Sequence, residues 1–346
     1  VKDAETYFHD NTISECYVYD SIIAVENSLN LEMFSNTIKN CNHKDINENR
    51  LIIYIQNSNA YLFNNNITDC THYKKGFSLI QGYCDTDNYY FKFYSNIITN
   101  CYCNEGLSNT ITTNYRTNDF RDNIITYNED SSKSERAFNI EYNSGCQLIN
   151  NTVKNAYHVD SSAFKLSYSN NKNNQPSVIK DCIFINCKGN NDPGNGGLMV
   201  IIENLDYDLE FINVTFRDTD IAPNLMKRQN SFLIRVETTL DNPPSVKFTG
   251  CSFINLVNCE ESTAGGIGFI YKSQNGKVKT VIFEDTIFQQ IQNKNQDIGG
   301  AIFIAPDDKA RNVNLNVKGC NFTDVKSAGN GGAIGFDSAS RELIIE

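Results

Sequence analysis

The sequence predicts an all-β fold: a right-handed single-stranded parallel β-helix of about eleven rungs, each with three short strands. Three observations support this prediction. One short motif returns along the whole chain, its apolar segments run for only three to six residues, and Asn, Asp, Ser and Gly separate those segments. A motif that recurs every 20 to 50 residues is typical of solenoids. Short alternating segments bounded by turn residues indicate strands rather than helices.

The clearest copy of the motif is residues 93–101, FYSNIITNC. It contains an aromatic residue, two further residues, Asn, one residue, an apolar residue, two residues and Cys. Residues 8–16 repeat it, and we expect versions one residue shorter at 34–41 and 63–70. Later copies replace Asn by Cys or Val and place Phe at the centre, as in residues 248–256.

The central apolar residue of each copy serves as a marker for its rung. Successive markers lie 25 to 37 residues apart, and we expect their side chains to form one inward-facing column. The eleven markers are Ile13, Ile38, Ile67, Ile98, Ile125, Val153, Phe184, Phe216, Phe253, Phe288 and Phe322.

Each copy also contains an apolar segment before the Asn and a third one roughly ten to thirteen residues after the marker. The first kind occurs at residues 61–63, 90–93, 209–211, 246–248, 278–283 and 313–317. The third kind occurs at residues 22–25, 51–55, 77–80, 137–140, 163–166, 198–202, 232–236, 267–270, 301–304 and 333–336. Parallel crossovers are nearly always right-handed, which sets the expected hand of the coil.

The repeat covers residues 1–346 without a linker, so we predict a single continuous β-helix domain. Both ends fall inside a motif copy, so we also expect the chain to be a fragment of a longer protein. No apolar run is long enough to span a bilayer, and no signal peptide is visible. The net charge of −11 leaves no basic stripe for nucleic acid.

Two tetrapeptides carry a resemblance to a known family. Phe-x-x-Asn occurs at residues 8–11, 63–66, 93–96 and 120–123, and Gly-Gly-Ala-Ile at 299–302 and 331–334. The pair resembles the repeats of the polymorphic outer-membrane-protein family, within the pectin-lyase-like β-helix superfamily. This resemblance implies an extracellular surface rod that acts in adhesion or as a section of a stalk or filament, without catalysis. No C-terminal translocator barrel is recognisable in this segment.

Polysaccharide lyases and hydrolases also use the β-helix, so a carbohydrate-active enzyme is the first alternative. Hydrolases of this kind need clustered carboxylates. The adjacent pair Asp307 and Asp308 fits a solvated turn, and the Asn-Thr-Asp, Gly-His-Gly and Arg-Ile-Lys motifs of such hydrolases are absent from the sequence. Residues 85–88 alternate oxygen ligands but lack the Gly and Glu of an EF-hand calcium loop.

No cofactor site is predicted. The glycines of residues 329–335 do not match a dinucleotide fingerprint and open no helix. The four histidines are too scattered for a metal site, so we expect surface imidazoles, with His9 able to stack across rungs. They are His9, His43, His72 and His158.

The cysteines form two columns. Cys16, Cys41, Cys70 and Cys101 each stand three residues after a marker, in four consecutive rungs. Stacked neighbours would lie about 4.8 Å apart, which permits either buried thiols or rung-to-rung disulfides. A second column two residues before the marker contains Cys182, Cys251 and Cys320, too far apart to bond with one another. Cys84, Cys103, Cys146 and Cys259 lie off both columns.

Four Asn-x-Thr sequons are candidate N-glycosylation sites, and their position relative to the inward markers predicts that all four amides point outward. They are Asn66, Asn150, Asn213 and Asn321.

The function that we predict is a non-catalytic extracellular or cell-surface β-helix. Its expected partners are other proteins or glycans at a cell surface, with self-association end to end also considered. Binding is expected in the longer loops at residues 170–177, 188–197, 218–230 and 257–265. A self-assembling fibril protein is the second alternative.

Overall fold

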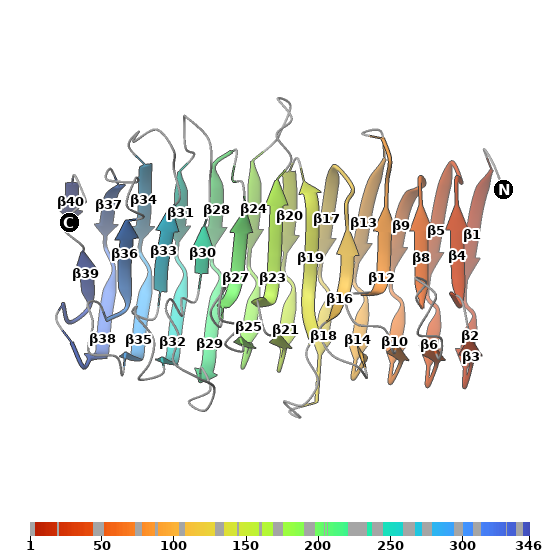
Figure 1. Ribbon diagram of the computed structural model, residues 1–346, viewed down its shortest axis with the longest axis horizontal. Helices are drawn as coiled ribbons and strands as arrows, with labels where there is room; N and C mark the ends of the chain where they lie inside the picture. The colour runs from red at the N-terminus through yellow and green to blue at the C-terminus, as the bar shows by residue number, and fades with distance from the viewer. Residues whose placement is uncertain are drawn as a thin grey trace.

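The computed structural model has strands as its only regular secondary structure among the described residues, and the strands stack side by side along one axis (Figure 1). The described residues are 4–18, 21–43, 52–72, 78–86, 89–103, 108–128, 135–143, 145–158, 161–168, 176–189, 198–203, 205, 207–220, 234–236, 245–258, 267–271, 279–293, 300–306, 313–329, 331–336 and 342–346.

Two parallel sheets run from one end of the described chain to the other. Sheet 1 has twelve strands: β1 (Glu5–His9), β5 (Asn30–Phe34), β9 (Asn59–Phe63), β13 (Tyr90–Tyr94), β17 (Thr117–Arg121), β20 (Gly145–Ile149), β24 (Ser177–Lys180), β28 (Leu209–Ile212), β31 (Val246–Thr249), β34 (Lys279–Glu284), β37 (Val313–Lys318) and β40 (Glu342–Ile345). Sheet 2 has eleven: β2 (Thr12–Ser14), β6 (Thr37–Lys39), β10 (Asn66–Thr68), β14 (Ile97–Thr99), β18 (Ile124–Thr126), β21 (Thr152–Lys154), β25 (Ile183–Ile185), β29 (Thr215–Asp220), β32 (Ser252–Asn258), β35 (Ile287–Asn293) and β38 (Asn321–Ser327).

The third side of the coil is sheet 3: β4 (Ile23–Glu26), β8 (Ile53–Gln56), β12 (Ser78–Tyr83), β16 (Ser108–Thr113), β19 (Glu135–Asn143), β23 (Ser161–Tyr168), β27 (Leu198–Glu203) and β30 (Ile234–Val236). A separate sheet of β33 (Ile267–Tyr271), β36 (Ile302–Pro306) and β39 (Ile334–Phe336) follows it in the same row (Figure 1). Strands of sheet 3 lie in front and run upward while those of sheet 1 run downward behind them, so the coil is right-handed (Figure 1).

Short strands add a partial fourth side between sheets 2 and 3, which the three-strand prediction lacked. They are β3 (Tyr17–Val18), β7 (Asn42–His43), β11 (Thr71–His72) and β15 (Tyr102–Cys103) in the first four rungs, then β22 (Tyr157–His158) and β26 (Lys188–Gly189). In the rung of Ile125, between β15 and β22, the equivalent positions are 129 and 130, which lie outside the described residues.

The predicted marker column is confirmed. Every marker is in register with the next across sheet 2, from the Ile13–Ile38 pair to the Phe288–Phe322 pair. Markers between the two ends are buried, and those of the terminal rungs, Ile13 and Phe322, pack against the same core. In the second half the column becomes a stack of Phe rings with centroids 4.7 to 5.2 Å apart.

The two shortened motif copies are an error of alignment. Phe93 pairs with Leu62 rather than Phe63, and Phe8 pairs with Met33 rather than Phe34. Leu62 and Met33 therefore occupy the inward aromatic position, and no residue is deleted. Phe34 and Phe63 lie one position later on the outer face of sheet 1, where their rings stack 4.8 Å apart. An aromatic residue at either of two adjacent positions misleads an alignment based on side-chain type.

Among the strands of sheet 3, one had no counterpart in the predicted third row of apolar segments. The strand β16 has the sequence SNTITT, with Ile111 as its one aliphatic residue, so hydropathy did not reveal it. Backbone hydrogen bonds alone set its register with β12 and β19.

The Gly-Gly-Ala-Ile motif requires glycine for a steric reason where its two copies stack on one another. A Cβ on Gly300 would stand 1.6 Å from the carbonyl oxygen of Gly332 in the next rung.

Candidate functional site

The motif Asn forms a ladder inside the corner between sheets 1 and 2. Asn36, Asn65, Asn96, Asn123 and Asn151 are buried, with at most 2% of each exposed. The residue before each is in the left-handed region, for example Ser95 at φ 55°. Side chains that tolerate this conformation, mainly Asp, Asn and Ser, occupy these turn positions.

Asn96 illustrates the bonding of the ladder. Its Nδ2 donates to the carbonyl oxygens of Leu62 and Tyr94 at 2.9 and 3.0 Å. Its Oδ1 accepts from the backbone N–H of Asn65 and from Asn65 Nδ2, both at 2.9 Å. Each amide thus satisfies backbone groups of its own rung and its neighbour, which the tight turn leaves without a strand partner.

The second cysteine column continues this ladder. Cys182 stands where earlier rungs have Asn, and its Sγ donates to the carbonyl oxygens of Leu148 and Lys180 at 3.2 and 3.3 Å. Cys251 makes the same pair of contacts with Phe211 and Thr249. Here a thiol replaces the amide as a weaker donor to the same corner carbonyls.

The first cysteine column occupies the corner after sheet 2 in the same way. Cys101 Sγ donates to the carbonyl oxygens of Ile67 and Thr99 at 3.6 and 3.4 Å, and Cys70 repeats the pattern one rung earlier. Cys187 belongs to this column and escaped the sequence analysis, because Asn128 and Ala156 stand at the two positions before it. All eleven described cysteines are free thiols, whereas Cys259 lies outside the described residues.

Burial makes these thiols poor nucleophiles. It raises the pKa of Cys182 and Cys187 to about 12 and that of Cys251 to about 11. Since the thiolate is the reactive form, Cys182, Cys187 and Cys251 serve as structural donors rather than catalytic groups. Cys70 differs, because its hydrogen bond with Cys101 lowers the pKa of its thiol.

A group of buried ionisable residues lies between β15 and β22, at the start of β19. Glu135 begins β19, has 2% of its surface exposed, and accepts hydrogen bonds from the Ser108 hydroxyl and from the backbone N–H of Cys103. Burial raises the pKa of its carboxyl to about 8, so the carboxyl is mainly protonated at neutral pH.

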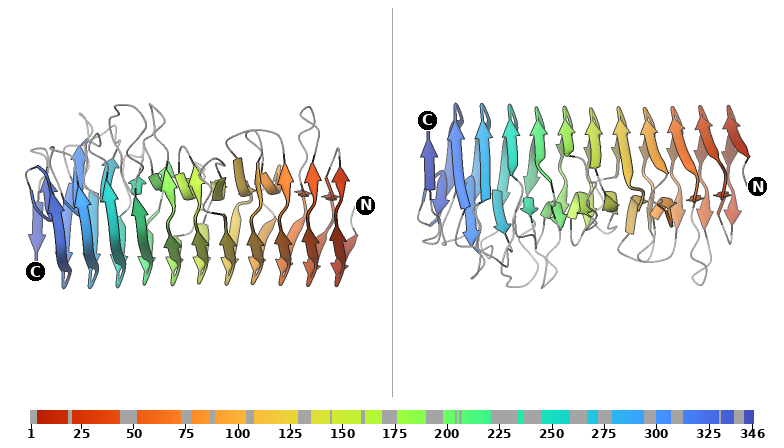
Figure 2. Two further views of the ribbon diagram at one scale, coloured as in Figure 1. Left: turned by 90° about the horizontal axis from the view of Figure 1, so that it is seen from below. Right: turned by 90° about the horizontal axis from the view of Figure 1, so that it is seen from above.

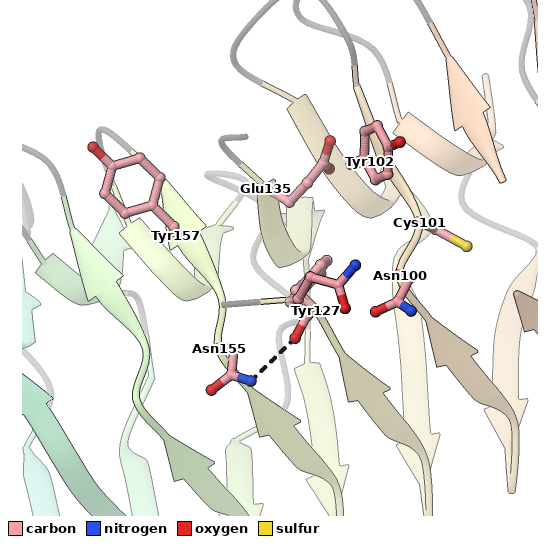
Figure 3. Close-up of a pocket in the computed structure, with 8 residues that line it drawn as sticks. Asn100, Cys101, Tyr102, Tyr127, Glu135, Asn155 and Tyr157 are labelled. Carbon is pink, nitrogen blue, oxygen red and sulfur yellow. Dashed lines mark hydrogen bonds between the residues drawn. The ribbon is translucent and has the colours of Figure 1, made fainter. Parts of the chain in front are cut away.

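The cavity beside Glu135 is small. Its volume is about 50 Å³, and Tyr102, Tyr127 and Tyr157 contribute to its lining (Figure 3). Asn155 Nδ2 donates to the carbonyl oxygen of Tyr127 at 3.1 Å, which fixes the turn that forms the cavity floor. This volume is enough for ordered water beside the carboxyl group of Glu135.

His158 and Arg136 lie buried near this cavity. Arg136 donates to Asn109 and Asn139 at 3.2 Å, and its guanidinium lies 3.4 Å from His158 Nδ1. Burial, reinforced by Arg136, lowers the pKa of His158 well below the usual value. The prediction of a surface imidazole is therefore wrong for His158, because its strand β22 turns the ring into the coil. His9 does stack on Phe34, with ring centroids 4.7 Å apart.

A larger groove of about 220 Å³ lies on the outer face of sheet 1, over β34, β37 and β40. It contains two carboxylates, and each makes an ion pair: Glu284 with Lys247 at 2.7 Å and Glu346 with Lys318 at 3.4 Å. In the described part of the chain, no three His, Cys, Asp or Glu side chains gather in a way that would hold a metal ion.

The earlier carboxylate candidates lie apart from these cavities. Asp85 belongs to a corner, where Asn57 Nδ2 donates to it at 2.9 Å and lowers the pKa of its carboxyl. Asp87, Asn88, Asp307 and Asp308 fall outside the described residues, as do most residues of the four predicted binding loops.

All four sequon amides lie exposed at the surface, in two different settings. Asn66 and Asn321 stand on the outer face of sheet 2, where the sequon Thr hydroxyl donates to the amide oxygen at 2.9 and 3.1 Å. Asn150 and Asn213 occupy left-handed corner positions, and their Nδ2 groups donate to Asp122 and Asp181 of the preceding rung.

Aromatic side chains, most of them half-buried, gather on the outer face of sheet 1 in the first four rungs. His9, Phe34 and Phe63 stack with nearly parallel planes, and Arg121 lies 5.6 Å from the ring centroid of Tyr94. The stacked rings cover one another's faces and present edges to solvent. A sugar needs an open ring face for stacking, so this arrangement supports rung-to-rung adhesion more than a saccharide platform.

No protein-family model, no curated protein and no solved structure matches this chain. Across the described residues we find no helix with the length and hydropathy needed to span a membrane.

Proposed function

We propose that the chain is a non-catalytic β-helical rod displayed outside the cell, where it acts in adhesion or as a section of a stalk. One observation carries this proposal: eleven markers remain in unbroken register, with corner ladders of Asn and Cys beside them. Buried polar groups along these corners serve to bond one rung to the next. Such a construction favours a long, rigid surface over a reaction site.

The cavities support the same reading. The buried Glu135 adjoins a small cavity of about 50 Å³, and the carboxylates of the groove on sheet 1 form ion pairs with lysines. A glycosidase needs two carboxyl groups about 5 to 10 Å apart across a bound sugar. The cavity beside Glu135 is lined by one carboxyl group, and lysines engage both carboxylates of the groove on sheet 1.

Within this proposal, the chain is a relative of the polymorphic outer-membrane-protein repeats. The supporting feature is the shared role of Phe-x-x-Asn, in which Phe93 and Phe120 point into the core while Asn96 and Asn123 bond the corner. Covalent glycans on the exposed sequons would suit display outside the cell.

Two measurements test the proposal. Antibodies against the chain should label intact, non-permeabilised cells of the source organism, and labelling only after permeabilisation would contradict surface display. Incubation with acidic and neutral polysaccharides should release no new reducing or unsaturated ends. Turnover that a Glu284→Gln or Glu346→Gln substitution abolishes would instead establish the carbohydrate-active alternative.

A further inference from the structure

The outer face of sheet 2 differs from the rest of the molecule in charge. We define this face by the two residues that flank each marker, twenty-two positions in all across the eleven strands. The exposed carboxylates of Asp218 in β29 and Asp324 in β38 lie beyond these positions, at left-handed residues. None of the twenty-two flanking residues is Asp or Glu, in a chain whose net charge is −11. The three charged residues are the cations Lys39, Lys154 and Arg217. The outer face of sheet 1, by contrast, carries Glu32, Asp119 and other carboxylates.

This face also gathers exposed aliphatic side chains. Ile97, Ile124, Ile183 and Ile287 are 38 to 43% exposed and all occupy the position before a marker. Thr, Ser and Asn fill most of the remaining positions, so the surface is made of short, often β-branched side chains. Exposed apolar residues aligned over several rungs mark an interaction surface rather than isolated surface positions.

The surface is regular as well as uncharged. Tight turns with left-handed residues join sheets 1 and 2 in nearly every rung and form an even edge along the molecule (Figure 2). Side chains on such a sheet stand in straight rows, about 4.8 Å apart along the axis. A second sheet of the same kind can pack on it face to face, at about 10 Å.

We infer that the outer face of sheet 2 pairs with the same face of a second copy of this chain. Two copies that each carry a charge of −11 repel one another, and this face lets them approach without opposing carboxylates. Eleven rungs about 4.8 Å apart and strands about 10 Å wide give about 500 Å² per copy, or about 1,000 Å² in total. That area is at the lower limit for a specific interface, so the dimer is weak and depends on concentration.

The register selects one arrangement. With the rods parallel and a two-fold axis along them, strands of the two copies run in opposite directions. The residue before each marker then faces the residue after the same marker in the partner. Lys39, Lys154 and Arg217 each face a Thr, namely Thr37, Thr152 and Thr215, so no cations oppose one another. Ile183 faces Ile185, and Ile124 faces Thr126.

Pairing and glycosylation of this face exclude each other. Asn66 and Asn321 stand in the same row as the exposed isoleucines, so a glycan on either would separate the two sheets. Asn150 and Asn213 lie at the corner and remain compatible with the dimer. The inference concerns the unmodified face and does not depend on where the rod is displayed.

Sedimentation equilibrium over a range of protein concentrations tests the pairing. The unmodified chain should show a reversible monomer–dimer equilibrium that stops at two copies. Ile124→Glu should raise the dissociation constant at least tenfold, because each new carboxylate is desolvated against Thr126 of the partner without a cation opposite it. The matched control Ile149→Glu, on the outer face of sheet 1, should leave it unchanged. Circular dichroism establishes that each variant is folded.

A mixing experiment tests the register. Thr126→Lys should also weaken self-association, since it adds a cation to the same contact. In an equimolar mixture with the Ile124→Glu chain, the new Lys of one copy faces the new Glu of the other, and heterodimers should form more strongly than either homodimer. A monomer at every concentration, association that Ile124→Glu leaves intact, or no gain on mixing would each overturn the proposed interface.

Discussion

At the scale of single residues, the buried amide of the corner ladder has the clearest role. Asn96 bonds three rungs at once, because its neighbours Asn65 and Asn123 and the carbonyl oxygen of Leu62 all belong to other turns of the coil. An apolar replacement leaves several buried backbone groups without partners, and such groups are costly.

We expect Asn96→Ala to lower the free energy of unfolding by about 3 kcal/mol, as several buried hydrogen bonds are lost. Asn96→Cys should lower it by less, because the thiols of Cys182 and Cys251 donate to the equivalent carbonyl oxygens in their own rungs. Urea unfolding of both variants measures the difference. Equal losses for Ala and Cys would show that the thiols do not replace the amide.

Glu135 should make stability depend on pH. Its pKa is about 8 in the folded chain and near 4.5 when exposed, so between these values the folded state holds an extra proton. Stability therefore falls as pH rises from about 4.5 to about 8, by at most about 1.4 kcal/mol for each pH unit.

Glu135→Gln should remove this dependence. Relative to the natural chain, the free energy of unfolding of the variant should increase progressively from pH 4.5 to pH 8 and stay higher by a constant amount above pH 8. Thermal unfolding at several pH values checks this expectation, with the exposed Glu5→Gln as control. Parallel pH profiles for the natural chain and the variant would show that Glu135 is already ionised at neutral pH.

At the scale of elements, aromatic residues stack both inside and outside the coil. Phe248 of β31 lies between Phe211 and Phe283 in the core, with centroids 4.5 and 4.7 Å away. Phe63 of β9 stacks on Phe34 at a similar distance but on the outer face of sheet 1. Phe248 and Phe63 are thus stacked at nearly the same spacing, and they differ in whether the stack is buried.

Phe248→Ala should cost about 3 to 5 kcal/mol of unfolding free energy, because it opens a cavity in a closely packed column. Phe63→Ala removes the same atoms from a half-buried position and should cost about 1 kcal/mol. Comparing the two by urea unfolding separates burial from ring stacking. Similar losses would mean that the outer aromatic row stabilises the rod as much as the core does.

At the scale of the whole molecule, the corner columns bond each rung to its neighbours by hydrogen bonds instead of covalent links. We expect every described cysteine to react with an alkylating reagent in denaturant without reductant, and the buried ones to react slowly in the native state. Mass spectrometry counts the added groups. A count that rises after reduction would reveal rung-to-rung disulfides.

Much of this architecture was readable from the sequence. The recurring apolar marker specified the axis, the number of repeats in sheet 2 and the inward column, because a periodic core must stack in register. The strand β16 was invisible to hydropathy, since Thr and Asn fill it and backbone pairing alone places it. Cys187 was missed for a similar reason, as unrelated side chains separate it from its column.

Periodicity by itself determined the fold class, because apolar residues spaced one turn apart are buried only when turns are stacked. The sequence could not decide between adjacent aromatic positions, so Met33 and Leu62 appeared as deletions until strand register resolved them. Nor could it show that Glu135 and His158, from neighbouring strands β19 and β22, are both buried. Those features depend on contacts between distant rungs, and so does the carboxylate-free face of sheet 2, which exists only once eleven separate strands are aligned.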